Sequence, residues 1–203
     1  MQIKTTFKPN PKLNIKDNIY RTRIDGLYFF SNIHHHDDRG YFSEVAHANR
    51  IEKLTNEQFK VAQVNHSRSK TNVIRGMHAE GWNKLVTVIS GVCFCALADI
   101  RPDSPTFSKV ETFVLGDGPQ ALAGSLFVTQ GIANSLCVIQ GPSDYIYLVD
   151  KLYQNRDKSN DQAISIFDPD LNIDWPITKD KIIISDRDKQ TITLRETYPE
   201  KFK

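Results

Sequence analysis

A histidine and a lysine six positions apart have the residue types needed to remove a proton next to a carbonyl group. They are His78, which ends the segment Arg75-Gly76-Met77-His78, and Lys84. A histidine can accept the proton, and a nearby cation stabilises the negative charge that then develops on oxygen. A histidine base also gains from a carboxylate that fixes its orientation. Many acidic residues are available for that role, and spacing alone selects none of them.

Tyrosines offer a second proton-transfer group. Tyr145 and Tyr147 are two positions apart, so a strand would place both on one face, and Tyr153 follows shortly after. Tyrosines at such spacing usually pack in a core or at its rim, although any of the three could donate a proton. From the residues alone, both interpretations stay open.

Clusters of histidine and cysteine raise the question of a metal site. Of the three histidines at 34–36, only the first and third would share a face of a strand, which leaves no clear third ligand. Cys93 and Cys95 would share a face in the same way, and Cys137 alone does not complete a zinc site. We therefore expect a solvated turn at residues 34–40, buried apolar cysteines and no metal.

Length and composition favour one packed domain over residues 1–203. Hydrophobic residues make up 39% and charged residues 25% of the chain, and the net charge of +2 gives no reason to expect nucleic acid. No apolar run approaches the roughly 20 residues of a membrane helix, and a secretory signal is not recognisable. The cysteine count of 3 is odd, which argues against a disulfide framework. We expect a cytoplasmic protein without nucleic-acid or membrane partners.

Short β-type runs between glycine and proline turns dominate the chain. Their spacing, without helical crossovers, predicts an all-β sandwich or barrel. An extended arm is expected over residues 1–25, one helix over 47–58, and a mixed C-terminal segment over 163–203 that packs on the barrel. The strands are expected at residues 27–30, 41–45, 59–65, 84–89, 92–99, 109–115, 125–129, 134–139 and 145–149.

Several short motifs follow one another in order between about residues 25 and 190. They are Asp37-Asp38-Arg39-Gly40-Tyr41-Phe42-Ser43-Glu44, Gln63-Val64-Asn65-His66-Ser67, Arg75-Gly76-Met77-His78, Lys84-Leu85-Val86, Asp99-Ile100-Arg101 with Ser104-Pro105-Thr106-Phe107, Asp168-Pro169, Ile173-Asp174-Trp175-Pro176 and Ile184-Ser185-Asp186-Arg187-Asp188. Each motif is weak alone, but their order resembles that of the dTDP-4-dehydrorhamnose 3,5-epimerase family. The resemblance implies a cupin-type jelly roll and a metal-independent epimerase without a cofactor.

The resemblance also implies roles for individual residues. The catalytic base corresponds to His78, and its carboxylate partner to Asp188, with Asp186 as the alternative. Lys84 corresponds to the lysine near the keto oxygen, and Tyr147 to the tyrosine that acts from the other face of the sugar. The substrate-binding residues would be Gln63, Asn65, Arg75 and Asn134, with Arg39, Phe42 and Glu44 at the nucleotide end.

Two positions depart from the family pattern. Asn134 replaces a histidine, and an amide can hydrogen-bond but carries no proton at neutral pH. Glu80 puts a negative charge where a neutral amide is usual, in a loop that is several residues shorter than in the family. The change at Asn134 favours inversion of one sugar centre rather than two.

The expected substrate is a nucleotide-linked 4-keto sugar, whose keto group acidifies the hydrogens at C3 and C5. Proton removal would give an enolate, and reprotonation from the other face would invert the centre. The alternatives are a 3,4-ketoisomerase, a non-catalytic sugar-nucleotide-binding cupin and a metal-dependent cupin oxygenase. The family usually forms homodimers in which an N-terminal strand reaches across to the partner, and the arm at 1–25 is compatible with this.

Overall fold

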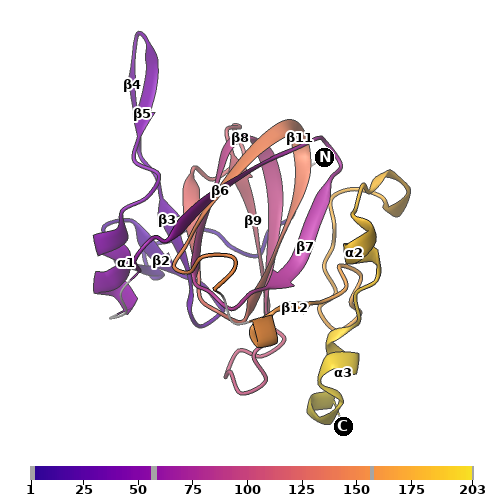
Figure 1. Cartoon of the computed structure of the whole chain (residues 1–203). Coiled ribbons are helices and arrows are strands. Elements are labelled where there is room, and N and C mark those ends of the chain that lie inside the picture. The colour runs from indigo at the N-terminus through magenta and orange to yellow at the C-terminus, as the bar shows by residue number, and fades with distance from the viewer. Residues whose placement is uncertain (1–2, 56–58, 156–157, 203) are drawn as a thin grey trace.

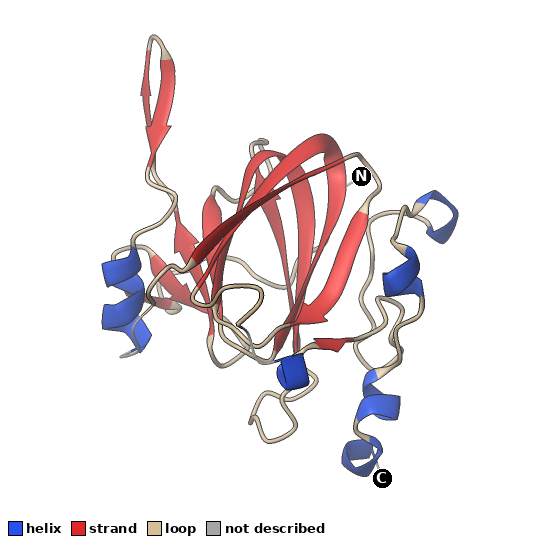
Figure 2. Cartoon of the chain, in the orientation of Figure 1, coloured by secondary structure: helices blue, strands red, loops and turns tan. Residues whose placement is uncertain are grey.

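The protein, described here as a computed structural model over residues 3–55, 59–155 and 158–202, consists mainly of antiparallel strands (Figure 1). Helices lie at the periphery of the strands (Figure 2). The helices are α1 (Ala48–Thr55), α2 (Asp186–Lys189), α3 (Leu194–Thr197) and the 3-10 turns η1 (Lys158–Asn160), η2 (Lys179–Lys181) and η3 (Pro199–Phe202). The strands are β1 (Asn14–Lys16), β2 (Ile19–Arg21), β3 (Leu27–Ser31), β4 (His34–Asp37), β5 (Gly40–Ser43), β6 (Gln63–Ser69), β7 (Ile74–Ala79), β8 (Lys84–Asp99), β9 (Val110–Gly116), β10 (Gly124–Val128), β11 (Ile132–Val149) and β12 (Gln162–Ala163). The predicted all-β class is confirmed.

Two long strands, β8 and β11, organise the sheet. They pair with each other from Ile132–Asp99 to Val149–Lys84, and β6, β7, β9 and β10 pair along their edges. The sequence analysis divided each into two shorter strands, and this division is wrong. The glycine-containing breaks are bends within continuous strands: a side chain at Gly91, whose φ is +76°, would meet the carbonyl of Gln140 on β11.

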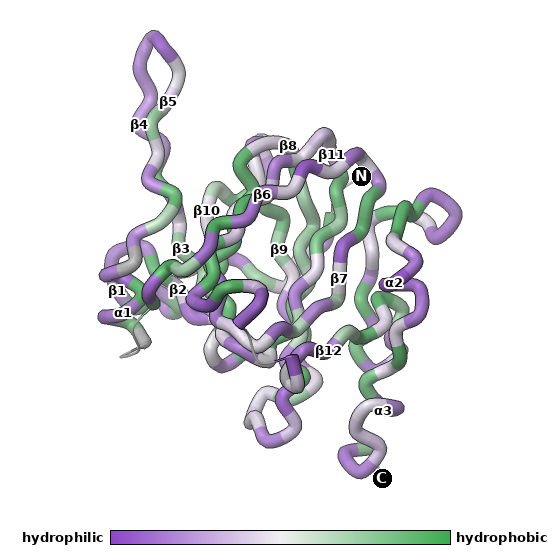
Figure 3. Tube along the Cα trace, in the orientation of Figure 1, coloured by the Kyte–Doolittle hydropathy of each residue, from purple (hydrophilic) through white to green (hydrophobic). Residues whose placement is uncertain are grey.

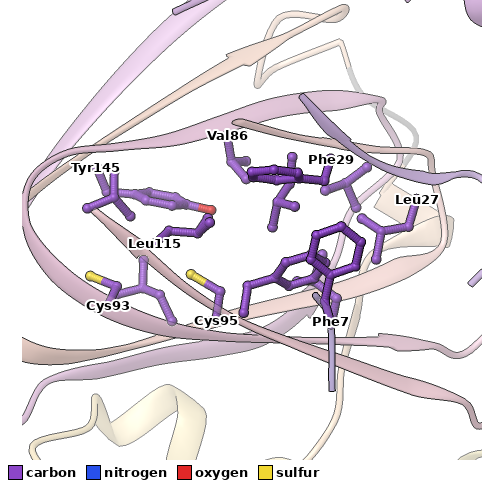
Figure 4. Packing of buried hydrophobic residues seen from close by; sticks show 14 of the residues in the cluster. Phe7, Leu27, Phe29, Val86, Cys93, Cys95, Leu115 and Tyr145 are labelled. Atoms are coloured by element: carbon purple, nitrogen blue, oxygen red, sulfur yellow. The ribbon is translucent and has the colours of Figure 1, made fainter. Parts of the chain in front are cut away.

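Strand β8 is buried on both faces, so the sheet has a core on each side. On one face, Cys93 and Cys95 join a cluster with Phe7, Phe29 and Tyr145 inside the barrel (Figure 4). On the other face, alternate residues of β8 pack against the C-terminal segment, including Ile164, Ile166, Leu171 and Leu194. Strands that are buried on both faces need hydrophobic residues on both faces, and Figure 3 shows β8, β9 and β10 as largely hydrophobic.

Several local expectations differ from the structure. Residues 34–40 were expected to be a turn, but they form most of the hairpin β4–β5, in which the ring of His34 stacks on Tyr41 at 4.0 Å. The extended arm contains β1 and β2, of which β1 pairs with β2 and β2 pairs with β3. The arm also buries Phe7 in the barrel, because an aromatic side chain is more stable there than in water.

The remaining boundaries shift by a few residues. The helix predicted over 47–58 is α1, and residues 56–58 lie outside the described part. The strand predicted over 59–65 pairs only from Gln63 onward, because its partner β11 ends at Val149. No helix in the described ranges has both the length and the hydrophobicity to cross a membrane.

Candidate active site

A cavity of about 790 Å³ lies between the barrel strands and the C-terminal segment. Its walls come from β6, β7 and β11, from the start of β8, and from residues 161–163, 183–185, 187 and 188. All four predicted catalytic side chains line it: His78, Lys84, Tyr147 and Asp188. The chain therefore brings together the base, the cation, the phenol and the carboxylate that the sequence analysis selected.

The register of the sheet explains how these side chains meet. His78 on β7 lies opposite Asn134 on β11. Thirteen positions further along β11, Tyr147 lies opposite Asn65 on β6, and the end of the strand reaches Lys84 on β8. Residues far apart in the sequence thus share one wall of the cavity because a single strand, β11, pairs with all three neighbours.

His78 is held by Asp188. Its Nε2 lies 2.7 Å from Oδ1 of Asp188, and the two side chains are 20% and 4% exposed. Asp188 belongs to α2, whose first turn is capped by Ser185, since the Ser185 hydroxyl accepts from the Asp188 N–H at 3.2 Å. The alternative partner, Asp186, is wrong: its side chain is 90% exposed and pairs with Lys189.

The surroundings keep this pair in the ionisation state that a base requires. Burial lowers the pKa of His78 below its ordinary value, although Asp188 partly opposes this effect. Burial alone would raise the pKa of Asp188, but hydrogen bonds from His78 and Arg187 outweigh it, and the net direction is downward. At neutral pH a neutral imidazole therefore faces an ionised carboxylate.

A further cation, Arg187, contacts both His78 and Asp188. Its Nη2 is 2.6 Å from Nε2 and 3.3 Å from Nδ1 of His78, and its Nε is 3.0 Å from Oδ1 of Asp188. The sequence analysis quoted Arg187 only as part of a motif and gave it no role. Its position beside Asp188 in a short segment with two aspartates was the available signal.

Lys84 is buried and bound to a carboxylate. Its Nζ donates to Oε2 of Glu80 at 2.5 Å and lies 3.4 Å from the carbonyl oxygen of His78. Glu80, noted from the sequence as a departure, therefore lines the cavity and neutralises much of the charge of Lys84. Any oxyanion stabilisation by Lys84 must act in the presence of this partner.

Two tyrosines line the cavity side by side, with ring centroids 6.0 Å apart. Burial raises the pKa of Tyr147, and the charge of Glu80 raises it further, so the phenol stays protonated at neutral pH. Tyr145 is more deeply buried, and its hydroxyl accepts from Nδ2 of Asn134 at 3.1 Å. The Oδ1 of Asn134 is buried and has no hydrogen-bond partner among the described residues, which leaves an acceptor for a substrate group.

The predicted substrate-binding residues divide into two groups. Arg75 and Asn65 line the cavity, and Gln63 lies behind Asn65 and donates to its Oδ1 at 2.6 Å. Arg39 and Phe42 do not line this cavity, because the hairpin β4–β5 projects away from the barrel (Figure 1), and neither does Glu44, which follows the hairpin. The side chain of Arg39 is 90% exposed and pairs with Asp37, and Phe42 is 71% exposed.

Metal ligands do not gather in this structure. Within the described ranges, no group of three or more histidine, cysteine, aspartate and glutamate side chains could hold a metal ion. The three cysteines are free and buried. The stacked ring of His34 belongs to the exposed hairpin and lies outside the cavity.

Comparison with known proteins connects this geometry to a family. The family model described as dTDP-4-dehydrorhamnose 3,5-epimerase matches residues 21–196. The chain is 31% identical over 184 residues to the dTDP-4-dehydrorhamnose 3,5-epimerase of Escherichia coli K12, covering 88% of this chain and 95% of that protein. It is 29% identical to the dTDP-4-dehydrorhamnose 3-epimerase of Streptomyces niveus, covering 85% and 82% of the two chains.

A solved structure gives the same result. The dTDP-6-deoxy-D-glucose-3,5-epimerase of Legionella pneumophila, determined in complex with dTDP-4-keto-L-rhamnose, has a TM-score of 0.79 at 30% identity and covers 91% of this chain and 96% of its own. The predicted cupin-type jelly roll and the predicted enzyme class, an epimerase, are confirmed. The chain belongs to the dTDP-4-dehydrorhamnose 3,5-epimerase family.

Proposed function

We propose that the protein inverts C3, C5 or both in a dTDP-linked 4-keto sugar. His78, oriented by Asp188, removes the proton, and Lys84 stabilises the enolate oxygen. Tyr147 returns a proton to the opposite face. The observation that carries this proposal is the buried contact of 2.7 Å between His78 and Asp188, in one cavity with Tyr147 and Lys84.

The side chains of the cavity that can transfer a proton favour inversion of a single sugar centre. Asn134 occupies a position where it donates to Tyr145 but has no titratable proton of its own. Its neighbour Tyr145 is deeply buried, and burial raises its pKa well above the ordinary value. The relative from Streptomyces niveus is named as a 3-epimerase, so the family includes enzymes described by one centre. We infer that C3 is inverted faster than C5.

Deuterium incorporation tests the reaction directly. The protein is incubated in D₂O with dTDP-4-keto-6-deoxyglucose, and NMR follows deuterium and configuration at C3 and C5. We expect deuterium and inversion at C3 first. A folded protein that incorporates no deuterium at either centre contradicts the proposal, and movement of the carbonyl from C4 to C3 would instead identify a ketoisomerase.

A matched pair of variants assigns the base. His78→Asn is expected to reduce deuterium incorporation by at least roughly 10²-fold, the usual contribution of a general base. Asp186→Asn is the control, because Asp186 lies on the same short helix as Asp188 but is exposed and outside the cavity. Equal loss in both variants would remove His78 from this role.

We also infer a homodimer in the cytoplasm. Phe42, Ile33 and Tyr41 on and beside the projecting hairpin are exposed, by 71%, 54% and 45%, and such apolar groups are more stable in an interface. Arg39, Phe42 and Glu44 lie outside the cavity of their own chain, so in a dimer they would serve the nucleotide in the cavity of the second copy. The three free cysteines agree with a reducing compartment.

A further inference from the structure

The short loop that joins β7 to β8 is anchored by hydrogen bonds to residues far from it in the sequence. The N–H of Gly81 donates to Oδ1 of Asp161 at 3.3 Å, and the carbonyl oxygen of Gly81 accepts from Nζ of Lys151 at 2.8 Å. Asn83 donates to both carboxylate oxygens of Asp150, through its backbone N–H at 3.0 Å and through Nδ2 at 2.9 Å. The loop therefore presents its first side chain from a fixed backbone.

That first side chain is Glu80, and it reaches Lys84 at the far end of the loop. Oε2 of Glu80 accepts from Nζ of Lys84 at 2.5 Å, and the two side chains are 24% and 5% exposed. Because the loop covers only residues 80–83, its first residue lies beside the first residue of β8. The two departures noted in the sequence, the short loop and the charge at position 80, are therefore parts of one arrangement.

The contacts of Lys84 leave one of its donors for a substrate. A lysine ammonium has three N–H donors. One of them binds Glu80, and a second is directed at the carbonyl oxygen of His78, which lies 3.4 Å from Nζ. Nζ has no other partner in the described part of the chain, and Lys84 lines the cavity. The third N–H is therefore available to an oxygen atom of a bound sugar.

We propose that Glu80 is a positioning residue, which holds the ammonium of Lys84 so that its remaining N–H is aimed at the enolate oxygen of the substrate. This inference rests on the proposed function, because it needs a keto sugar whose oxygen gains negative charge. Glu80 acts through Lys84 and exchanges no proton with the sugar. It also supplies the opposite charge that a buried ammonium requires, since a buried charge without a partner is costly.

A fixed direction of the donor is the physical benefit of this contact. Lysine carries its ammonium on a flexible four-carbon stem, so an untied head group would sample many directions. A donor that is already aimed needs no reorganisation when charge develops on the oxygen. Loss of Glu80 should therefore lower kcat more than it raises KM, because the aimed hydrogen bond gains strength only as the enolate forms.

Three measurements at position 80 separate positioning from a merely structural role. In Glu80→Ala, kcat at pH 7 should fall roughly tenfold or more, with little change in KM. Glu80→Gln keeps the length and an acceptor oxygen, so it should retain most of the rate. Formate should restore part of the rate of Glu80→Ala, because it can occupy the place of the missing carboxylate, whereas chloride at equal concentration should not. Equal losses in the two variants, no response to formate, or a faster Glu80→Ala overturns the proposal.

Acetylation of Lys84 tests the contact without turnover. Acetic anhydride reacts with a neutral amine, and peptide mass spectrometry measures the rate at each lysine. In the free protein, Glu80→Ala should increase the rate at Lys84 roughly tenfold, because the carboxylate that stabilises the ammonium form is gone. An unchanged rate at Lys84 would show that the two side chains are not paired in solution, and it would overturn the positioning role.

The matched control is an exposed pair of the same kind. Lys189 lies 2.8 Å from Asp186, and their side chains are 58% and 90% exposed. Asp186→Asn should change the acetylation rate at Lys189 by less than about twofold, because exposed ion pairs contribute little. A tenfold change there as well would mean that the effect at Lys84 does not depend on burial, which contradicts the argument for Glu80.

The two proposals fail on different observations. A protein that incorporates no deuterium, but whose Lys84 becomes more reactive in Glu80→Ala, contradicts the epimerase proposal and leaves the contact standing. An active epimerase in which the reactivity of Lys84 is unchanged contradicts the role of Glu80 alone. Dispersed NMR spectra establish that the variants are folded, and Glu80→Ser takes the place of Glu80→Ala if the latter does not fold.

Discussion

The charge state of His78 is set by opposing contacts, and their signs can be tested. Burial lowers its pKa, while the hydrogen bond and charge of Asp188 raise it. The lower value keeps the imidazole unprotonated at neutral pH and into mildly acidic solution. We therefore expect the acidic limb of kcat/KM to lie below the ordinary histidine value of about 6.5.

Asp188→Asn tests the contribution of the carboxylate. Removal of the contacts that raise the pKa of His78 should move the acidic limb to still lower pH. The maximal rate should also fall, by roughly 10²-fold or more, because the ring loses its orienting acceptor. A pH–rate profile measures both effects. A limb that moves to higher pH, or an unchanged rate, would contradict the assigned pair.

Glu80→Gln tests the departure from the family pattern. After burial, the charge of Glu80 is the largest contribution that raises the pKa of Tyr147. The amide should therefore lower this pKa and move the basic limb of the profile to lower pH, where the phenol loses its proton earlier. Direct titration of Tyr147 by ultraviolet difference spectroscopy, with Tyr147→Phe as the blank, checks the assignment. An unchanged titration would exclude this role of Glu80.

The site was only partly predictable at the scale of residues. His78 and Asp188 are 110 positions apart, and the order of the family motifs selected the pair that the fold brings to 2.7 Å. The position of Arg187 beside Asp188 indicated that it lies near the site, but its contact with the imidazole was not predictable, because that contact depends on how α2 packs against β7. The ion pair between Glu80 and Lys84 also depends on the conformation of a loop whose length differs from the family pattern.

At the scale of elements, local signals located most strands but not their continuity. Glycine and proline interrupt the hydrophobic pattern of β8 and β11, and such interruptions usually mark turns. Here the interruptions of the two strands face each other, with Gly91 against the carbonyls of Gln140 and Pro142. Both strands therefore bend at the same place and stay paired on either side of the bend. A bend differs from a turn only in how the strand pairs with its distant partner, and the sequence of one strand does not specify that pairing.

Gly91→Ala tests this bend. A methyl group there would lie 2.5 Å from the Gln140 carbonyl oxygen, at a residue whose φ of +76° already disfavours a side chain. We expect a loss of roughly 3 kcal/mol or more in the free energy of unfolding, which combines backbone strain with a clash. Denaturation by urea provides the measurement.

The matched control is Gly40→Ala in the hairpin. Gly40 also has a positive φ, of +131°, but a methyl group would meet no atom within 4 Å. It should cost only the backbone strain, about 1 kcal/mol. Equal losses for the two variants would mean that the close approach of β8 and β11 contributes nothing to stability.

At the scale of the whole molecule, the hairpin β4–β5 stands apart from the sheet and from the cavity of its own chain. It pairs with no strand of the barrel among the described residues, and Arg39 and Phe42 on it do not contact the cavity. If these residues serve the nucleotide, the functional unit is larger than one chain. A cavity in one copy would then be completed by the hairpin of another.

Mixing two inactive variants tests this arrangement. One chain carries His78→Asn, and the other carries Arg39→Ala with Phe42→Ala. In a mixed dimer, the cavity with an intact His78 would receive the intact hairpin of the first chain, so one site in that dimer would be complete. Random assortment should then restore about a quarter of the original activity, since closed two-fold dimers form statistically. Sedimentation velocity first establishes whether the protein is a dimer. Activity that stays at the sum of the two parents, in a protein that does form mixed dimers, would show that the hairpin does not complete its partner's site.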